Sequence, residues 1–297
     1  MSVMAYFVAL ALDGVLAGTI YALIALAFVL VYKASRVMNF ALGEWMVLGA
    51  VLAGVGSQSL QLGTVAALAF AVAGLAALAA GFYWLVARRL VARPAIAAIM
   101  VTLGLGMAMR GVGLLAFAGA QPLVPPDLFG QPVSIAGLTI VAGKLATAIV
   151  ASLGVALIGA FWRYSRTGVA LRAIADDPQA AMASGIDLDR QLAVVWSLAG
   201  MVAVIAGVLW SWVVGGGFGV AMIGLKVFPV VILGGLDSIL GTIVAAILVG
   251  LLETLGAGYL DRFLGSGFGA IAPYIALLAL LMVRPYGLFG QARVERV

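Results

Sequence analysis

Six ionisable side chains stand inside, or at the ends of, apolar stretches of this chain. They are Asp13, Glu44, Arg110, Lys226, Asp237 and Glu253. A charge in the hydrocarbon of a membrane costs at least a few kcal/mol, so such a residue commonly faces a ligand, an ion or an opposite charge. Lys226 is the hardest to explain otherwise, because it lies within a short apolar run. A carboxylate, a row of backbone carbonyls or a bound anion could each satisfy its ammonium group.

Structural roles compete with binding roles at the other positions. Glu44 begins a short apolar run and could stabilise a helix N-terminus, a contribution under about 1 kcal/mol. Asp13 and Arg110 could extend their side chains to the membrane surface. Asp237 and Ser238 coincide with a break in the apolar pattern, where freed backbone groups need water or a polar cavity.

The composition indicates a membrane protein built of helices. Of its 297 residues, 65% are hydrophobic and 9% charged, whereas soluble domains carry about 25% charged residues. Several apolar runs exceed the roughly 20 residues that cross a bilayer. The runs are 5–32, 39–56, 62–87, 95–118, 138–162, 189–214, 220–234, 239–257 and 267–283. We expect an all-α polytopic integral membrane protein that forms one transmembrane domain over 1–297. About 8–9 transmembrane segments are expected, one or two of them short, broken or re-entrant.

Several kinds of chemistry are excluded by composition. The chain has no cysteine and no histidine, which excludes disulfides and thiolate or imidazole metal sites. The net charge of +5 reflects membrane topology rather than nucleic-acid binding, because the basic residues flank apolar runs. No Gly-x-x-x-x-Gly-Lys-[Ser/Thr] phosphate loop occurs, so any ATP-driven activity needs a second protein.

The basic residues also predict an orientation. Twelve of the 16 fall in four clusters, at 33–36, 88–93, 163–190 and 284–296, while the connections near 57–61, 119–137 and 215–219 carry none. Placing the clusters in the cytoplasm puts the N-terminus outside and the C-terminus inside. The segment 119–137 holds four of the nine prolines and is expected to be an extended external loop, either a partner's landing surface or a plain connector.

The segment 163–190 is expected to be a cytoplasmic loop. Asp177 can cap a helix, Pro178 suits the first helical turn, and Gly185 offers a left-handed stop. The pattern predicts a helix of about two turns, too short to be stable alone and therefore docked on something. Its alternative is a solvated connection between helices.

Two breaks interrupt the apolar pattern, at 32–45 and at 234–241. Short or glycine-interrupted spans at matching places in two halves often mark a transporter's central site. The apolar runs at both breaks cross the membrane in the same direction. If the two halves of the chain are related by a repeat, the repeat is therefore parallel rather than inverted.

These stretches together resemble the membrane permeases of bacterial ABC importers for branched-chain amino acids, over nearly the whole chain. The matching motifs are Gly18-Thr19-Ile20-Tyr21-Ala22-Leu23-Ile24-Ala25-Leu26, Asn39-Phe40-Ala41-x-Gly43-Glu44, Gly224-Leu225-Lys226-x-Phe228, Gly234-Gly235-x-x-Ser238-Ile239-x-Gly241 and Arg284-Pro285-x-Gly287-Leu288-Phe289-Gly290.

The resemblance implies two sets of functional residues. The expected translocation path comprises Tyr21, Asn39, Glu44, Lys226, Asp237 and Ser238. The expected ATPase-coupling segment comprises Arg172, Asp176, Asp177, Gln179, Ala180, Ala181 and Gly185. Three positions depart from the family pattern: Gln179 replaces a glutamate, Leu42 a polar residue, and Asp237 a glycine.

The resemblance further implies an assembly in the bacterial cytoplasmic membrane. Its partners would be a second related permease, two ATP-binding subunits that carry ATP-Mg, a periplasmic substrate-binding protein and membrane lipid. The chain itself would hold no cofactor and catalyse no reaction. Branched-chain or other small hydrophobic amino acids are the expected substrates, with urea, short amides or aromatic carboxylates as alternatives.

Two other classes compete with this interpretation. An ion-coupled carrier would need buried carboxylates, which Glu44, Asp237 and Glu253 could supply. An intramembrane protease would need a Gly-x-Gly-Asp motif, but Leu236 stands where the second glycine should be.

Overall fold

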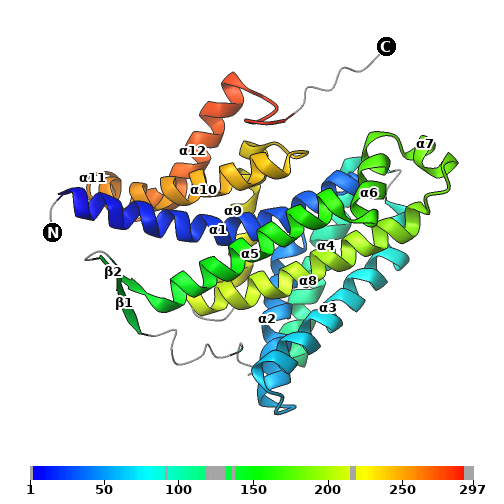
Figure 1. Cartoon of the computed structure of the whole chain (residues 1–297), viewed down its shortest axis with the longest axis horizontal. Helices are drawn as coiled ribbons and strands as arrows, with labels where there is room; N and C mark the ends of the chain where they lie inside the picture. Colours follow the sequence, from blue (N-terminus) through cyan, green and yellow to red (C-terminus); the bar gives the residue numbers. More distant parts are fainter. Residues whose placement is uncertain are drawn as a thin grey trace. The chain divides into compact units, whose positions relative to one another are not determined.

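The computed structural model describes residues 3–90, 93–117, 123, 131–135, 138–214 and 219–290. Helices dominate it (Figure 1). The elements, in order, are α1 (Val3–Ser35), α2 (Leu42–Gln58), α3 (Thr64–Leu85), η1 (Ala87–Arg89), α4 (Ala95–Ala116), β1 (Pro132–Ile135), β2 (Leu138–Val141), α5 (Ala142–Tyr164), α6 (Arg166–Asp176), α7 (Pro178–Ala183), α8 (Leu188–Val214), α9 (Gly219–Gly234), α10 (Ile239–Leu255), η3 (Gly256–Leu260), α11 (Asp261–Leu264) and α12 (Phe268–Val283).

Six of the described helical segments are long and apolar enough to cross a membrane. They are Val3–Ser35, Thr64–Arg89, Ala95–Ala116, Ala142–Tyr164, Leu188–Val213 and Ile239–Leu264. The remaining three apolar runs form the shorter helices α2, α9 and α12, with 17, 16 and 16 residues. A polytopic helical membrane protein is therefore confirmed, whereas the number of spans and the short, broken or re-entrant spans stay predictions.

The chain divides into two compact units. Unit 1 comprises Met1–Val29, Pro126–Val155 and Lys226–Val297, and unit 2 comprises Leu30–Pro125 and Ala156–Leu225. The helices α1, α5 and α9 each supply part of their length to either unit.

Unit 2 has a core in which α2, α3 and α8 lie side by side (Figure 1). Small residues bring the helices together: a Cβ at Gly49 would lie 2.8 Å from the Cα of Val204. Close approach through small residues is the usual way in which helices pack in a membrane. The side chains of Trp45, Phe82 and Trp196 fill the space between the three helices, with ring centroids 5.4–6.4 Å apart.

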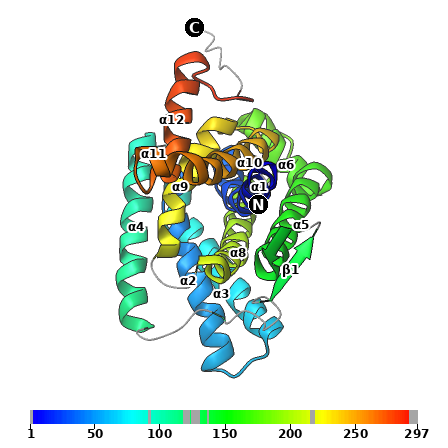
Figure 2. The ribbon, with the colours of Figure 1, turned by 90° about the vertical axis from the view of Figure 1, so that its left-hand side faces the viewer.

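Unit 1 is organised around α1 and α10, which lie next to each other (Figure 2). A Cβ at Gly18 would lie 2.7 Å from the Cα of Ile247, so the two backbones are almost in contact. The helix α12 packs on α10 and on the π-helical turn η3 that continues it. This close packing holds the middle of α1 against α10 and thereby positions the charged residues of unit 1.

The structure confirms both breaks in the apolar pattern. After α1 ends at Ser35, Arg36 adopts a left-handed backbone conformation with φ 57°. At the second break, α9 ends at Gly234 and Gly235 has φ 97°. Glycine suits this second position because it has no Cβ to clash in the left-handed region.

A short β-hairpin interrupts the otherwise helical chain at the end of the proline-rich segment 119–137. β1 and β2 pair as an antiparallel hairpin, with Pro132 opposite Val141 and Ser134 opposite Thr139. The apolar run 138–162 therefore starts as a strand, and β-branched residues such as Ile140 and Val141 favour this extended conformation. Residues 119–122, 124–130, 136 and 137 lie outside the described residues.

The basic clusters of unit 2 meet at one end of its helices. The Lys33 ammonium lies 5.4 Å from the ring centroid of Trp162 at the end of α5. The Tyr83 hydroxyl at the end of α3 donates to Asp189 at the start of α8, at 2.7 Å. These two contacts bring the ends of α1, α3, α5 and α8 that lie next to the basic residues close together, and the membrane orientation stays a prediction.

Candidate translocation and coupling sites

A lysine, a glutamate and a tyrosine meet inside the apolar helices of unit 1. Lys226 on α9 forms an ion pair with Oε1 of Glu253 on α10. The Tyr21 hydroxyl on α1 donates to the other carboxylate oxygen, Oε2, at 2.6 Å. Both oxygens of Glu253 are thereby engaged, and the side chains of Lys226 and Glu253 are 33% and 20% exposed.

The packing of α1 on α10 explains why Tyr21 reaches Glu253. Gly14 and Gly18 on α1 face Gly250 and Ile247 on α10. Because helical side chains lean towards the helix N-terminus, the Tyr21 ring extends back along α1 in the direction of Gly14. That direction leads to the end of α10 where Glu253 lies. The small residues therefore set the spacing, and the aromatic side chain makes the polar contact.

A second ion pair in unit 1 explains Asp13. The Lys144 ammonium near the start of α5 donates to Oδ1 of Asp13 at 2.6 Å. Both side chains are about 40% exposed. The Asp13 carboxylate therefore has a direct cationic partner, which the sequence analysis did not identify.

The second break is fixed by two segments that both belong to the sequence motifs. Ser238 caps α10 by accepting a hydrogen bond from the Gly241 amide at 3.0 Å. The tail after α12 returns to the end of α9, where the Leu288 amide donates to the Leu233 carbonyl at 2.8 Å. A Cβ at Gly235 would lie 2.6 Å from the amide nitrogen of Gly290, so the glycines permit this backbone contact. Ser238 thus has a clear structural role, and Asp237 lies in the same turn.

The first break lies in unit 2 and is tied to α4. The Thr102 hydroxyl on α4 is within hydrogen-bonding distance of the Met38 carbonyl and accepts from the Phe40 amide, both at 3.2 Å. Asn39 is 1% exposed, and its Oδ1 accepts from the Ala41 amide at 3.1 Å. The Asn39 side-chain nitrogen has no hydrogen-bond partner among the described residues.

Glu44 is paired rather than isolated. The guanidinium of Arg110 on α4 donates through Nε to Oε1 of Glu44 at 2.9 Å. The Glu44 side chain is 12% exposed and that of Arg110 is 50% exposed. The ion pair joins the first turn of α2 to α4, so Glu44 has a stronger partner than the helix dipole alone.

Two of the sequence motifs touch each other in unit 2. A Cβ at Gly224, near the start of α9, would lie 2.9 Å from the Cα of Gly43 on α2. Neither helix could keep this approach with a side chain at Gly224. This contact gives a physical reason for glycine at position 224.

The polar segment after α5 forms two short helices with well-defined caps. The Ser165 hydroxyl accepts from the Gly168 amide at 2.8 Å and caps α6. Arg172 on α6 donates through Nη1 to the Trp162 carbonyl at 3.1 Å and to the Arg163 carbonyl at 3.2 Å. A cation at the carboxyl end of α5 satisfies carbonyls that have no helical partner. Arg172 therefore fixes α6 against α5.

The two-turn helix predicted from the sequence is present as α7. Oδ1 of Asp177 accepts from the amides of Gln179 and Ala180 at 2.9 and 3.0 Å. At the other end Gly185 has φ 84°, and the Ile186 amide donates to the Ala181 carbonyl at 3.1 Å. This is the Schellman arrangement, in which a left-handed glycine closes a helix. Both ends of α7 are thus fixed locally.

The helix α7 presents one face to the surface. Gln179 and Ala180 are exposed, and Met182 is 50% exposed. Ala181 is buried at 4% exposed, so it packs within unit 2 rather than facing outwards. Asp176 is exposed at the end of α6.

The expected path residues are therefore distributed over both units. Tyr21, Lys226, Asp237 and Ser238 belong to unit 1, where the first two share Glu253. Asn39 and Glu44 belong to unit 2. The sequence analysis did not place Glu253 or Arg110 in the path, although both stood out as charges in apolar runs. The signal that could have found them is charge complementarity to Lys226 and Glu44.

Comparison with known proteins identifies a permease family and several relatives that align with nearly the whole chain. The family model described as "Branched-chain amino acid transport system / permease component" matches residues 10–283. The chain is 28% identical to the high-affinity branched-chain amino acid transport system permease protein LivH of Escherichia coli K12, over 98% of both chains. It is 27% identical to the permease protein BraD of Pseudomonas aeruginosa, over 96% of both. Among solved structures, PsaBC from Streptococcus pneumoniae in complex with Fab aligns with 91% of this chain and 89% of that chain at 17% identity and a TM-score of 0.47.

Proposed function

Because the chain belongs to the family of branched-chain amino acid transport system permease components, we propose that it is the membrane-spanning subunit of an ATP-driven importer. The observation that carries the proposal is the match to this family over residues 10–283. The relatives named as permeases align along nearly their full length. Branched-chain amino acids are the proposed substrates, and urea, short amides or aromatic carboxylates are the alternatives.

The assembly needs further subunits. Since the sequence lacks a phosphate loop, ATP-Mg is bound and hydrolysed by two partner ATPase subunits. A second, related permease completes the membrane-spanning part, and a periplasmic binding protein delivers the substrate. The complex lies in the bacterial cytoplasmic membrane. The N-terminus is outside and the C-terminus is in the cytoplasm, in agreement with the shared position of the basic ends in unit 2.

The segment α6–α7 is the proposed contact with the ATPase. Its support is geometric: α7 is capped at both ends and exposes Gln179, Ala180 and Met182. A short helix whose ends are fixed can transmit a displacement without unfolding. Arg172 fixes α6 against α5, Asp177 and Gly185 close the two ends of α7, and the buried Ala181 anchors α7 to its own unit. Asp176 adds an exposed carboxylate to the proposed contact. Gln179 offers a hydrogen bond where a glutamate would offer a charge.

The proposed path uses the polar groups that interrupt the apolar helices. Tyr21 and Lys226 contribute from unit 1, together with Asp237 and Ser238 at the second break. Asn39 and Glu44 contribute from the first break. Ion-paired side chains inside a membrane protein commonly mark the route of a polar substrate.

A pair of substitutions tests the coupling assignment. Ala180→Arg places a long cation on the exposed face of α7, and Ser59→Arg places the same side chain at the exposed end of α2. In the transporter assembled with Ala180→Arg, all subunits should be expressed at normal levels. The complex should nevertheless lose the stimulation of its ATP hydrolysis and its leucine uptake. Ser59→Arg should retain both. Normal uptake by Ala180→Arg would refute the coupling assignment. The substrate assignment is tested separately, by leucine uptake of the unmodified transporter.

A further inference from the structure

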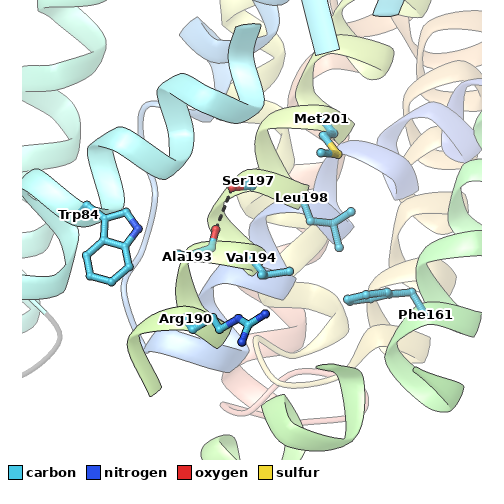
Figure 3. Close-up of a pocket in the computed structure, with 8 residues that line it drawn as sticks. All are labelled: Trp84, Phe161, Arg190, Ala193, Val194, Ser197, Leu198 and Met201. Atoms are coloured by element: carbon cyan, nitrogen blue, oxygen red, sulfur yellow. Dashed lines mark hydrogen bonds between the residues drawn. The ribbon is translucent and has the colours of Figure 1, made fainter. Parts of the chain in front are cut away.

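Unit 2 contains an open groove of about 380 Å³ that none of the proposed functions uses (Figure 3). Trp84 on α3 and Phe161 on α5 line it, together with the face of α8 that carries Arg190, Val194, Leu198 and Met201. The volume lies within the range of ordinary small-molecule sites. It is not a gap left by poor packing between single side chains.

The walls of this groove are hydrocarbon and aromatic, and its one hydroxyl is already satisfied. Ser197 donates to the Ala193 carbonyl of its own helix at 2.9 Å, as Figure 3 shows. Arg190 and Met201 mark the two ends of the lining stretch of α8 (Figure 3). Their positions are eleven residue steps apart, about 16 Å along a helix at 1.5 Å per residue. The site therefore fits a flexible apolar chain better than a compact polar molecule.

One end of the groove carries the guanidinium of Arg190. Among the described residues, no carboxylate forms a salt bridge with the Arg190 guanidinium. Two carboxylates lie close by in the sequence and keep their negative charge, but their hydrogen bonds go to neutral donors: Asp189 accepts from the Tyr83 hydroxyl at 2.7 Å, and Asp187 accepts from the Arg190 backbone amide at 3.0 Å. A second guanidinium, that of Arg88, lies 5.5 Å from the ring centroid of the lining Trp84.

We propose that this groove binds an anionic phospholipid. One acyl chain lies along α8 between Trp84 and Phe161, and the phosphate binds Arg190, with Arg88 adding positive potential at the rim. The apolar groove suits the hydrocarbon of the membrane, and the arginines and the tryptophan at its end suit the level of the lipid headgroups. A guanidinium binds phosphate oxygens in a bidentate manner, which distinguishes this occupant from a purely apolar helix of a partner protein.

Native mass spectrometry of the full chain in detergent tests the proposal. The protein is titrated with phosphatidylglycerol or phosphatidylcholine that carry identical acyl chains. The anionic lipid should bind about fivefold better, the effect of one basic side chain near a headgroup. Arg190→Gln should abolish this preference, and Val194→Trp should reduce binding of both lipids because it fills the groove. Arg284→Gln, at an exposed arginine outside the groove, should retain the preference.

Three results would overturn the proposal. Equal binding of both lipids to the unmodified chain would remove the anionic component. Unchanged binding to Val194→Trp would place the lipid elsewhere. Photo-crosslinks from position 194 to a second protein subunit, in place of lipid, would identify this face as a protein interface.

Discussion

Lys226 and Glu253 form an ion pair between two consecutive helices, α9 and α10, and Tyr21 of α1 occupies the carboxylate oxygen that the lysine leaves free. A single charge in this position would be unfavourable, whereas the triad leaves no unpaired charge within it. Opening it to a passing amino acid would replace one set of charged contacts by another. The same three side chains therefore stabilise unit 1 and take part in the proposed translocation path.

Neutralising this pair separates a transport role from a structural one. Lys226→Met or Glu253→Gln should each lower thermal stability, because the remaining charge is unpaired. The double variant should regain stability but still show uptake reduced about tenfold or more, as expected for the loss of a charged contact to substrate. Radiolabelled leucine uptake and thermal unfolding in detergent measure the two effects. The matched control is Asp13→Asn with Lys144→Met, which should transport normally. Normal uptake by the Lys226–Glu253 double variant would mean that the pair is only structural.

The hydroxyl of Tyr21 should contribute measurably to stability. Tyr21→Phe removes the 2.6 Å hydrogen bond to Glu253, and bonds to a charged group contribute roughly 1.5 kcal/mol or more. Tyr6→Phe is the matched control, because the Tyr6 hydroxyl donates to a neutral carbonyl, that of Gly258, at 3.3 Å. Thermal unfolding should show a larger decrease for Tyr21→Phe than for Tyr6→Phe. Equal decreases would argue against a strong bond at Glu253.

Substituting Gly18 should disrupt the contact between α1 and α10. A Cβ there would lie 2.7 Å from the Cα of Ile247, and such overpacking costs about 1–3 kcal/mol. Gly81 on α3 is the control, because a Cβ there meets nothing within 4 Å. Gly81→Ala should be neutral or stabilising by up to about 1 kcal/mol, since alanine favours a helix. A stable Gly18→Ala protein would show that the two helices can separate without loss.

Removing the cap of α7 should weaken its coupling to the partner ATPase, although the exposed side chains of Gln179, Ala180 and Met182 are unchanged. Asp177→Ala deletes the acceptor for two amides, a loss of about 1 kcal/mol for a helix cap. Amide hydrogen exchange at 178–185 should accelerate, and ATPase stimulation should fall. Asp177→Asn retains an acceptor oxygen and should behave almost normally. Faster exchange with unchanged stimulation would indicate that an ordered α7 is not needed for coupling.

The sequence predicted the helices well because apolar length alone identifies a membrane span. It also predicted α7, because the cap at Asp177 and the stop at Gly185 are local. The β1–β2 hairpin was missed because its short apolar strand merges with the following helix. Charge complementarity marked Glu253 as a possible partner of Lys226, but choosing it over the other acidic residues requires knowing how α9 and α10 face each other. Asp13 and Glu44 were recognised as charges, but their partners Lys144 and Arg110 are distant in sequence.

The most direct test of the account is leucine uptake by proteoliposomes that contain this chain with its permease, ATPase and binding-protein partners. We expect uptake that requires ATP and the binding protein and that stops when the phosphate loop of the partner ATPase is inactivated. Uptake driven by an ion gradient, with this chain alone and no ATP, would contradict the account.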